Sequence, residues 1–262
     1  MEIAVCIKQV PSKSVCLDKK SGRLNRGQGG GQLNPKDYIA VETALKISEA
    51  AGGRVTALCM GPETAEESLR TALSMGADRA VLISDRAFAG ADVYATAFTL
   101  SQAVRALGGF DIIVCGQQSA DGGTSQLPFS LAAQLGIPCI GWVKKINTAE
   151  NGITEAAQEL SFGTQTVKIK PPFLLAAGEE TGKPRLPGLR GQLNAKRATV
   201  VKLGLKDMEI KDSGRYGQNA SPTSVVSVRE TEQKHKNPVL ELSPSEAAEL
   251  ILKKWEAANG EQ

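Results

Sequence analysis

The sequence predicts an α/β protein in which helices cover both faces of a parallel β-sheet. The first observation is an alternation of short apolar runs with segments that carry leucine or alanine at three- and four-residue spacing. The second is a loop rich in glycine and hydroxyl side chains after one of these runs. The third is that the alternation stops after residue 143. A main α/β domain with a smaller extension is therefore expected.

The expected elements alternate from the N-terminus onward. Strands are predicted at residues 3–10, 55–60, 80–84, 112–115 and 139–143. Helices are predicted at residues 35–50, 65–75, 93–107 and 126–135. Right-handed crossovers bring the polar strand ends at 8–11, 60–62, 85–92 and 116–124 to one edge of the sheet. A ligand cleft is expected at that edge.

The first helix should begin at Asn34 and Pro35, because asparagine is favoured as an N-cap and proline at the first helical position. Asn34 is expected as a cap, either alone or together with a ligand contact. Residues 12–33, before this helix, form a long insert with three consecutive glycines at 29–31. Loops of this length in a compact domain are functional or disordered. We expect a flap over the cleft, with a solvated loop as the alternative.

Residues 111–136 say most about function. An apolar run ends at Gly116, a polar loop follows with Gly122 and Gly123, and a helix-like segment comes next. Backbone N–H groups in such a turn, with the helix dipole, can hold an anionic group, and glycine allows close approach. Thr124 and Ser125 add hydroxyl donors and possible helix caps. An ordinary strand-to-helix turn fits the same pattern equally well.

The second half of the chain predicts a hairpin at residues 153–170, a short strand at 173–177 and a polar irregular stretch at 208–221. Residues 178–200 are rich in glycine, proline and arginine, and Leu186, Leu189 and Leu193 stand among charges. Exposed leucines ringed by basic residues are typical of an anchor for a partner protein, although a solvated connection has the same composition.

A strand is predicted at 223–229, and a last helix from residue 243 carries Leu250, Ile251 and Trp255 along one face. The charged stretch before this helix suggests an arm that carries it onto another subunit. The predicted organisation is an α/β domain at residues 1–200, with the hairpin and a loop at about 178–200, and a C-terminal arm and helix at 201–262.

Composition excludes several classes. The chain has 262 residues, a net charge of +3, dispersed basic residues and only 4% aromatic residues, so nucleic acid and anionic membranes are poor partners. No apolar run of about 18 residues is present, so no membrane span is expected. Five cysteines without CxxC spacing suit a reducing cytoplasm. The single histidine, His235, argues against histidine-based triads and the usual zinc sites.

Several long motifs occur in order along the chain. They are VCIKQVP at 5–11, NPKDYIAVETAL at 34–45, MGPETAEESLRTALSMGADRAVLISD at 60–85, GQQSADGGTSQ at 116–126 and PRLPGL at 184–189. Together they resemble the beta subunit of electron-transfer flavoproteins over most of residues 1–200. The resemblance implies a Rossmann-like fold, an alpha-subunit partner that carries most of an FAD site, and dehydrogenase partners such as acyl-CoA dehydrogenases. It implies an electron carrier rather than an enzyme that converts a metabolite, with no catalytic acid or base.

The resemblance also implies site residues. Carried over residue by residue, the family's nucleotide site falls on Cys6, Asn34, Pro35, Lys36, Asp37, Met60, Gly116, Gln117, Gln118, Ser119, Ala120, Asp121, Gly122, Gly123, Thr124, Ser125, Gln126 and Leu127. The family's partner-recognition loop falls on residues 184–197, with Leu189 at the apolar anchor position beside Pro184, Arg185, Leu186 and Arg190.

The nucleotide itself differs within the family. Some members hold AMP as a structural ligand, whereas flavin-bifurcating members hold a second FAD that is reduced by NADH. DRAFAGADVYAT at 85–96 resembles the bifurcating group, with Asp92 opening a helix beside the cleft, and favours a second FAD. Gly123 departs from that group, because an acidic residue is common there, and the 29–31 glycines are also unusual.

Two other readings stay open on the residues alone. One is an ATP- or AMP-binding α/β module without a redox role, although the GxxxxGK[ST] loop and a serine- and glycine-rich loop after the first strand are absent. The other is a structural subunit whose nucleotide loop is vestigial.

Overall fold

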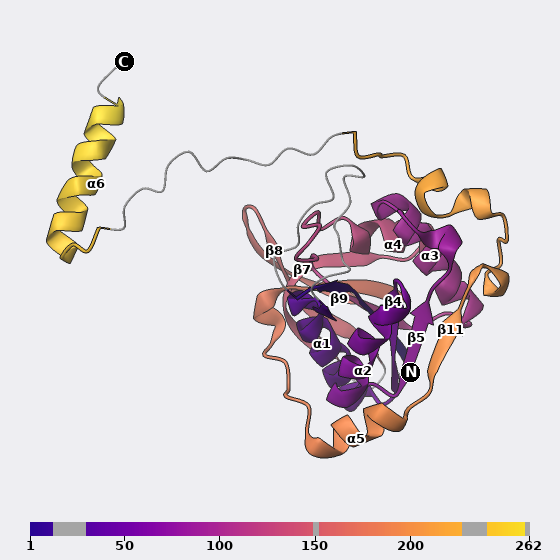
Figure 1. Ribbon diagram of the computed structural model, residues 1–262. Coiled ribbons are helices and arrows are strands. Elements are labelled where there is room, and N and C mark those ends of the chain that lie inside the picture. Colours follow the sequence, from indigo (N-terminus) through magenta and orange to yellow (C-terminus); the bar gives the residue numbers. More distant parts are fainter. Residues whose placement is uncertain (13–29, 149–151, 227–239, 260–262) are drawn as a thin grey trace. The chain divides into compact units, whose positions relative to one another are not determined.

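The computed structural model describes residues 1–12, 30–148, 152–226 and 240–259 (Figure 1). His235, Cys16, most of the glycine-rich insert and part of the predicted arm lie outside the described residues. The chain forms two compact units, Met1–Val226 and Ser227–Gln262. The described part of the second unit contains the helix α6 (Pro244–Asn259), as expected from the sequence.

A nine-stranded sheet forms the centre of the first unit, in the order β11-β5-β4-β1-β6-β10-β7-β8-β9. The strands from β11 to β7 are parallel, and β7, β8 and β9 pair antiparallel. A separate ribbon pairs β2 (Gln9–Pro11) with β3 (Gly31–Leu33). The sheet strands are β1 (Glu2–Ile7), β4 (Arg54–Met60), β5 (Arg79–Ile83), β6 (Ile112–Gly116), β7 (Cys139–Thr148), β8 (Thr154–Leu160), β9 (Gly163–Ile169), β10 (Phe173–Ala177) and β11 (Val200–Leu203).

Helices cover both faces of this sheet, which confirms the predicted α/β fold class. Side chains of α1 and α2 join one buried cluster, and those of α3 and α4 join the other. Figure 1 shows the two pairs of helices on opposite sides of the sheet. The helices of the first unit are α1 (Pro35–Ala51), α2 (Glu66–Met75), α3 (Val93–Ala106), α4 (Leu127–Leu135) and α5 (Leu189–Arg197). Short 3-10 turns are η2 (Glu63–Ala65), η3 (Arg86–Phe88), η4 (Glu179–Thr181), η5 (Leu205–Asp207), η6 (Ser213–Arg215) and η7 (Gly217–Ala220).

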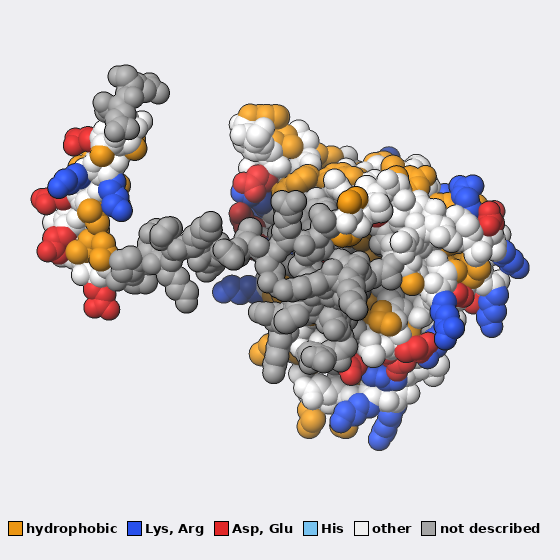
Figure 2. All heavy atoms as spheres, turned by 45° about the horizontal axis from the view of Figure 1, so that its top comes forward, with side chains coloured by type: hydrophobic (Ala, Val, Ile, Leu, Met, Phe, Trp, Pro, Cys, Tyr) orange, Lys and Arg blue, Asp and Glu red, His pale blue; other side chains and the backbone are white. Residues whose placement is uncertain are grey.

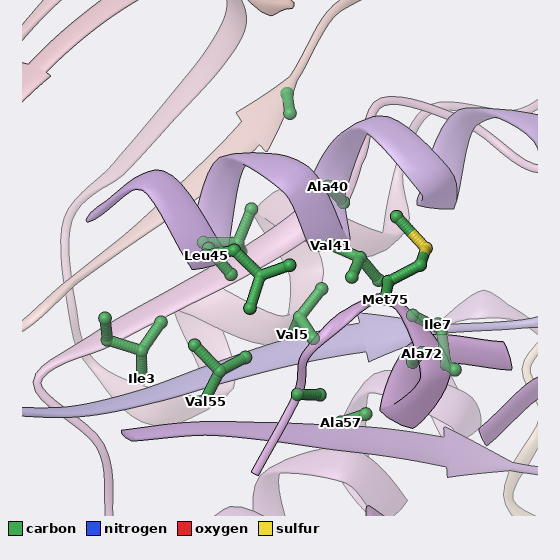
Figure 3. Packing of buried hydrophobic residues seen from close by; sticks show 14 of the residues in the cluster. Ile3, Val5, Ile7, Ala40, Val41, Leu45, Val55, Ala57, Ala72 and Met75 are labelled. Carbon is green, nitrogen blue, oxygen red and sulfur yellow. The ribbon is translucent and has the colours of Figure 1, made fainter. Parts of the chain in front are cut away.

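The period-two alternation along β1 divides its side chains between the two clusters. Ile3, Val5 and Ile7 belong to the α1 side, whereas Ala4 and Cys6 belong to the other side. Figure 3 shows Val41 and Leu45 of α1 above these strands. Each buried aliphatic side chain of this kind contributes about 1.5–3 kcal/mol relative to exposure. The packing fixes the first turn of α1 at the carboxyl edge of the sheet.

The structure corrects several predictions. The expected strand at 3–10 is two strands, β1 and β2, separated by Lys8. The segment at 178–200, expected as a partner anchor or a solvated connection, contains the helix α5, which buries only Ala195, and the four-residue strand β11 begins at its end. Residues 223–226, expected in a strand, are irregular, and the rest of that prediction lies outside the described residues. The first compact unit extends to Val226, and β11 pairs with β5 within it.

Within the described residues, none of the helices combines the length and apolar character needed to cross a bilayer.

Candidate functional site

A cleft of about 980 Å³ opens at the carboxyl edge of the sheet. Its floor lies where β1 pairs with β4 on one side and β6 on the other. The helices α1 and α2, which follow β1 and β4, lie on one face, and α4, which follows β6, lies on the opposite face. This reversal is the topological switch point at which open α/β sheets bind ligands. The four strand ends expected at one edge all contribute to the cleft.

Thirteen of the residues predicted from the sequence line this cleft: Cys6, Asn34, Asp37, Met60, Asp92, Gly116, Gln117, Gln118, Ser119, Gly122, Thr124, Ser125 and Leu127. Six others lie beside it without lining it: Pro35, Lys36, Ala120, Asp121, Gly123 and Gln126.

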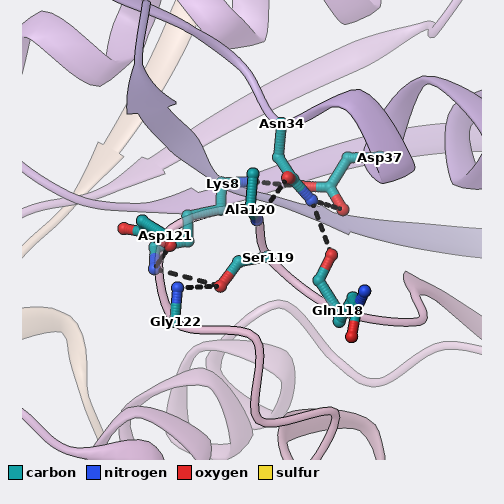
Figure 4. Close-up of polar contacts among 8 residues, drawn as sticks. All are labelled: Lys8, Asn34, Asp37, Gln118, Ser119, Ala120, Asp121 and Gly122. Carbon is teal, nitrogen blue, oxygen red and sulfur yellow. Dashed lines mark hydrogen bonds and ion pairs between the residues drawn. The ribbon is translucent and has the colours of Figure 1, made fainter. Parts of the chain in front are cut away.

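Asn34 clasps the polar loop that follows β6. Its side-chain N–H donates to the carbonyl of Gln118 at 3.0 Å, and its side-chain oxygen accepts from the N–H of Ala120 at 3.0 Å (Figure 4). The same amide donates to Asp37 at 2.9 Å. Asn34 occupies the N-cap position of α1, as predicted, but its side chain, 1% exposed, makes no cap hydrogen bond. Its amide orders the cleft loop instead.

Lys8 braces the other side of this loop. Its Nζ lies 2.6 Å from Oδ1 of Asp121 and donates to the hydroxyl of Ser119 at 3.4 Å (Figure 4). That hydroxyl also accepts from the N–H of Gly122 at 3.2 Å. The Asp121 side chain, 6% exposed, is turned to Lys8, which explains why it does not line the cleft.

Asp37 lies buried beneath the loop, 5% exposed. Its Oδ2 accepts from the N–H of Lys8 at 2.7 Å, and its Oδ1 accepts from Asn34. Burial raises the pKa of this carboxyl from 3.8 to about 7, although the hydrogen bonds from Asn34 and Lys8 lower it. The packing is close, because a Cβ on Gly116 would lie 2.2 Å from Oδ1 of Asp37.

The N-terminus of α4 lies at the cleft and has no side-chain cap. Gln126 occupies the cap position and makes no side-chain cap bond, and Leu127 and Pro128 line the cleft. Ser125 has a φ of 54°, and its hydroxyl donates to Gln118 Oε1 at 3.1 Å. Ser125 was expected as a possible cap of α4, and it does not fill that role. The first N–H groups of a helix lack intrahelical acceptors and favour an anion.

Asp92 opens α3 beside the cleft, as predicted. It caps α3, since Oδ1 accepts from the N–H of Ala95 at 3.0 Å, and Oδ2 accepts from the N–H and hydroxyl of Thr223. Burial alone would raise the pKa of Asp92, but these hydrogen bonds outweigh it and lower the pKa. Asp92 lines the cleft with both carboxylate oxygens already bonded to protein.

Two cations of the cleft were absent from the predicted site residues. Lys8 and Arg86 both line it, and both lie in strand-end segments that the sequence pattern had placed at this edge. Lys8 directly follows β1, and Arg86 comes three residues after the end of β5, so a positive residue close behind a buried strand was the available signal. The remaining lining residues that were not predicted individually are Ile7, Gly61, Pro62, Glu63, Ile83, Ser84, Asp85, Phe88, Ala89, Gly90, Ala91, Val93, Thr96, Leu100, Cys115 and Pro128.

The predicted partner segment is ordered by a buried ion pair. Glu42 of α1, 5% exposed, accepts from the N–H of Arg185 at 3.0 Å and from its Nε at 2.7 Å. Glu49 accepts from Nη1 of the same arginine at 2.7 Å. Burial alone would raise the pKa of Glu42, but the Arg185 hydrogen bonds outweigh it and lower the pKa. Arg185 therefore fastens the segment to α1 rather than projecting from it.

Leucines project from the segment that Arg185 fastens. Leu186 is 92% exposed, and Leu189 is 75% exposed at the start of α5. A Cβ on Gly191 would lie 2.3 Å from the Ser74 carbonyl oxygen, so α5 packs closely on the end of α2. In Figure 2, basic and hydrophobic side chains lie together at the lower end of the first unit, where Figure 1 places α5.

Comparison with known proteins finds one matching family profile and several relatives that are similar over most of the chain. The family profile "Electron transfer flavoprotein domain" matches residues 22–208. The "Electron transfer flavoprotein subunit beta" of Thermoanaerobacterium thermosaccharolyticum is 43% identical over 229 residues, covering 86% of each chain. "Protein FixA" of Bradyrhizobium diazoefficiens is 35% identical over 259 residues, covering 96% of this chain and 90% of its own. The "Caffeyl-CoA reductase-Etf complex subunit CarD" of Acetobacterium woodii is 36% identical over 227 residues, covering 86% of each chain.

Proposed function

The chain belongs to the beta-subunit family of electron transfer flavoproteins, and from that premise we propose that it binds an adenine nucleotide in the cleft and pairs with an alpha subunit. The heterodimer would pass electrons between dehydrogenases and acceptors. The observation that carries this proposal is the uncapped α4 N-terminus beside the glycine-containing loop at the switch point of the sheet.

The chemistry of the cleft fits a nucleotide. Main-chain N–H groups at the start of α4 and the Thr124 hydroxyl would hold phosphate, and Lys8 and Arg86 would offset its charge. Gly116 and Gly122 leave room for the ligand, since neither presents a side chain to the cleft. The ordered loop lowers the entropy cost of binding, because Asn34 and Lys8 hold it before a ligand arrives.

A second FAD is the proposed ligand rather than AMP. The cleft volume of about 980 Å³ lies at the upper end of the roughly 300–1,000 Å³ of ligand pockets, which suits a dinucleotide. Residues 85–96 carry the resemblance to the bifurcating group and form one wall of the cleft. A flavin there would supply electron transfer from NADH, and the protein would supply its orientation and electrostatics.

The partner surfaces follow from exposed leucines and the terminal helix. Leu186 and Leu189 are proposed to anchor a dehydrogenase such as an acyl-CoA dehydrogenase. The second unit is proposed to dock on the alpha subunit, because α6 exposes Ile251, Leu252 and Trp255 by 58–67%. A cytoplasmic location belongs to the proposal, since Cys6, Cys59 and Cys115 are buried free thiols.

The test is the nucleotide content of the heterodimer purified with its alpha subunit. Two FAD per heterodimer are expected, measured by absorbance and by chromatography of the acid-released nucleotides. One FAD with one AMP would instead establish a simple carrier. A colourless complex that takes up no FAD would contradict the redox function, and ATP turnover by that complex would favour an ATP-binding module.

A further inference from the structure

The chain after β11 crosses the outside of one wall of the cleft. We call residues 204–223 the strap and residues 85–92 the wall. The strap follows β11, drawn in orange in Figure 1, and its η7 turn contacts both η3 and α3. Wall residues line the cleft, including Arg86, Phe88 and Asp92, whereas no strap residue does.

The first end of the wall is fastened through Asp85. Its Oδ2 accepts from the N–H of Leu205 in the strap at 2.9 Å, and its Oδ1 caps η3 by accepting from the N–H of Ala87 at 3.0 Å. Just before it, the N–H of Ser84 donates to the carbonyl of Leu203 at 2.9 Å. The wall therefore leaves β5 with its direction fixed by the strap.

The middle of the wall packs against a buried aromatic side chain of the strap. Tyr216 of the strap is fully buried, and its ring centroid lies 5.2 Å from that of Phe88 and 5.3 Å from that of Phe98 in α3. The next residue, Gly217, has a φ of 59°, and a Cβ there would lie 2.2 Å from the Ala87 carbonyl oxygen. The strap backbone thus lies directly against the wall backbone, as only glycine allows.

The second end is fastened through Asp92. Its N–H donates to the Ser221 hydroxyl at 2.9 Å. Its Oδ2 accepts from the Thr223 hydroxyl at 2.8 Å and from the Thr223 N–H at 3.1 Å. The Ser221 hydroxyl in turn donates to the carbonyl of Gly217 at 2.8 Å. Both aspartates that bound the wall therefore use a carboxylate oxygen to hold the strap.

We propose that the strap sets the nucleotide affinity of the cleft by holding the wall in its binding geometry, with Thr223 as a positioning residue. This rests on the proposed nucleotide-binding function. Asp92 caps α3 beside the cleft, and its two oxygens divide their bonds between α3 and the strap. Without the bond from Thr223, the wall and its Arg86 would sample more conformations in the free protein. Ligand binding would then cost more conformational entropy, and the affinity would fall.

Thr223 is suited to a test because it is exposed and does not line the cleft. Thr223→Val keeps the side-chain shape and removes the hydroxyl, whereas Thr223→Ser keeps the hydroxyl. Ser224→Ala is the matched control, since Ser224 is exposed and its hydroxyl makes no hydrogen bond within the described part of the chain. Each variant is prepared as the full chain with its alpha subunit, stripped of nucleotide, and titrated separately with FAD and AMP.

Thr223→Val is expected to bind whichever of the two nucleotides the wild type prefers roughly three- to tenfold more weakly, as for the net loss of one ordinary hydrogen bond, because the Thr223 N–H still donates to Asp92. Thr223→Ser and Ser224→Ala should match the wild type in affinity and melting temperature, whereas the melting temperature of Thr223→Val should fall by no more than about 2–4 °C. Hydrogen exchange at the amides of residues 85–92 should accelerate in Thr223→Val alone. Equal affinity of Thr223→Val and wild type would overturn the inference while leaving the proposed function intact. A wild-type cleft that takes neither probe would overturn both.

Discussion

Gly116 and Asp37 fit together so closely that a methyl group on the glycine would lie 2.2 Å from Oδ1 of the aspartate. The two residues come from the end of β6 and the first turn of α1, and they meet beneath the cleft loop. Glycine at the end of this strand is therefore required by a buried carboxylate from another element.

Gly116→Ala should destabilise the protein by about 1–3 kcal/mol, the range for overpacking a buried site. The carboxylate cannot retreat without breaking its bonds to Asn34 and Lys8. Urea unfolding measures the change in free energy. Gly188→Ala is the control, because a Cβ there meets nothing within 4 Å. Equal stabilities of the two variants would contradict the packing argument.

The Asp37 carboxyl should make stability depend on pH. Burial raises its pKa from 3.8 to about 7 in the folded protein, so folding takes up a proton between these values. The free energy of unfolding should therefore fall as the pH rises through this window. Asp37→Asn removes the titration, and the difference in unfolding free energy between wild type and variant should shrink from pH 4.5 to pH 7.5. A difference in unfolding free energy that does not change with pH would show that the pKa of Asp37 lies outside this window.

Gly122→Val should lower the nucleotide content of the purified heterodimer. Gly122 lines the cleft, and its new Cβ would already lie 3.1 Å from the Ser119 hydroxyl, before the two methyl groups of valine are placed. Nucleotide bound per heterodimer is measured after acid release, and Gly122→Ala should retain more than Gly122→Val. Full occupancy in the valine variant would mean that the loop does not cradle phosphate.

Leu189→Ala should weaken electron delivery to an acyl-CoA dehydrogenase while flavin content stays the same. Truncating an apolar anchor at an interface costs at least about 1 kcal/mol, which corresponds to about a fivefold rise in KM. Phe162→Ala is the control, because Phe162 is 86% exposed at the β8–β9 turn. Unchanged KM in Leu189→Ala would remove Leu189 from the docking surface.

Glu42→Gln should loosen the same segment without touching the leucines. The Glu42 side chain is 6% exposed but that of Arg185 is 35% exposed, so the loss should fall between the several kcal/mol of a fully buried charge pair and the about 0–1 kcal/mol of an exposed one. Tryptic cleavage after Arg190 should therefore accelerate in Glu42→Gln and stay near the wild-type rate in Glu49→Gln, since the Glu49 side chain is 60% exposed.

In a double mutant that combines Glu42→Gln with Leu189→Ala, the effects of the two substitutions on KM should be less than additive. Additive effects would mean that Arg185 acts independently of the leucine.

The sequence was sufficient for the parallel sheet because its strands are buried apolar runs and its helices carry clear periodicity. The hairpin of β8 and β9 and the final helix α6 were also visible in the pattern. The helix α5 and the strand β11 were missed, since α5 buries only Ala195 and β11 is an edge strand of four residues. Such elements take their form from the surfaces they pack on.

Local patterning by itself determined which residues lie at the carboxyl edge, because parallel strands joined by right-handed crossovers leave their polar ends together. It therefore placed Lys8, Asp92 and Gly122 near one another without any coordinates. Only the tertiary structure decided what each side chain does there. Asn34 clasps a distant loop, Arg185 fastens to Glu42, and Asp92 holds Thr223. Hydrogen-bond partners far apart in the chain are chosen by three-dimensional distance and burial, which no local spacing encodes.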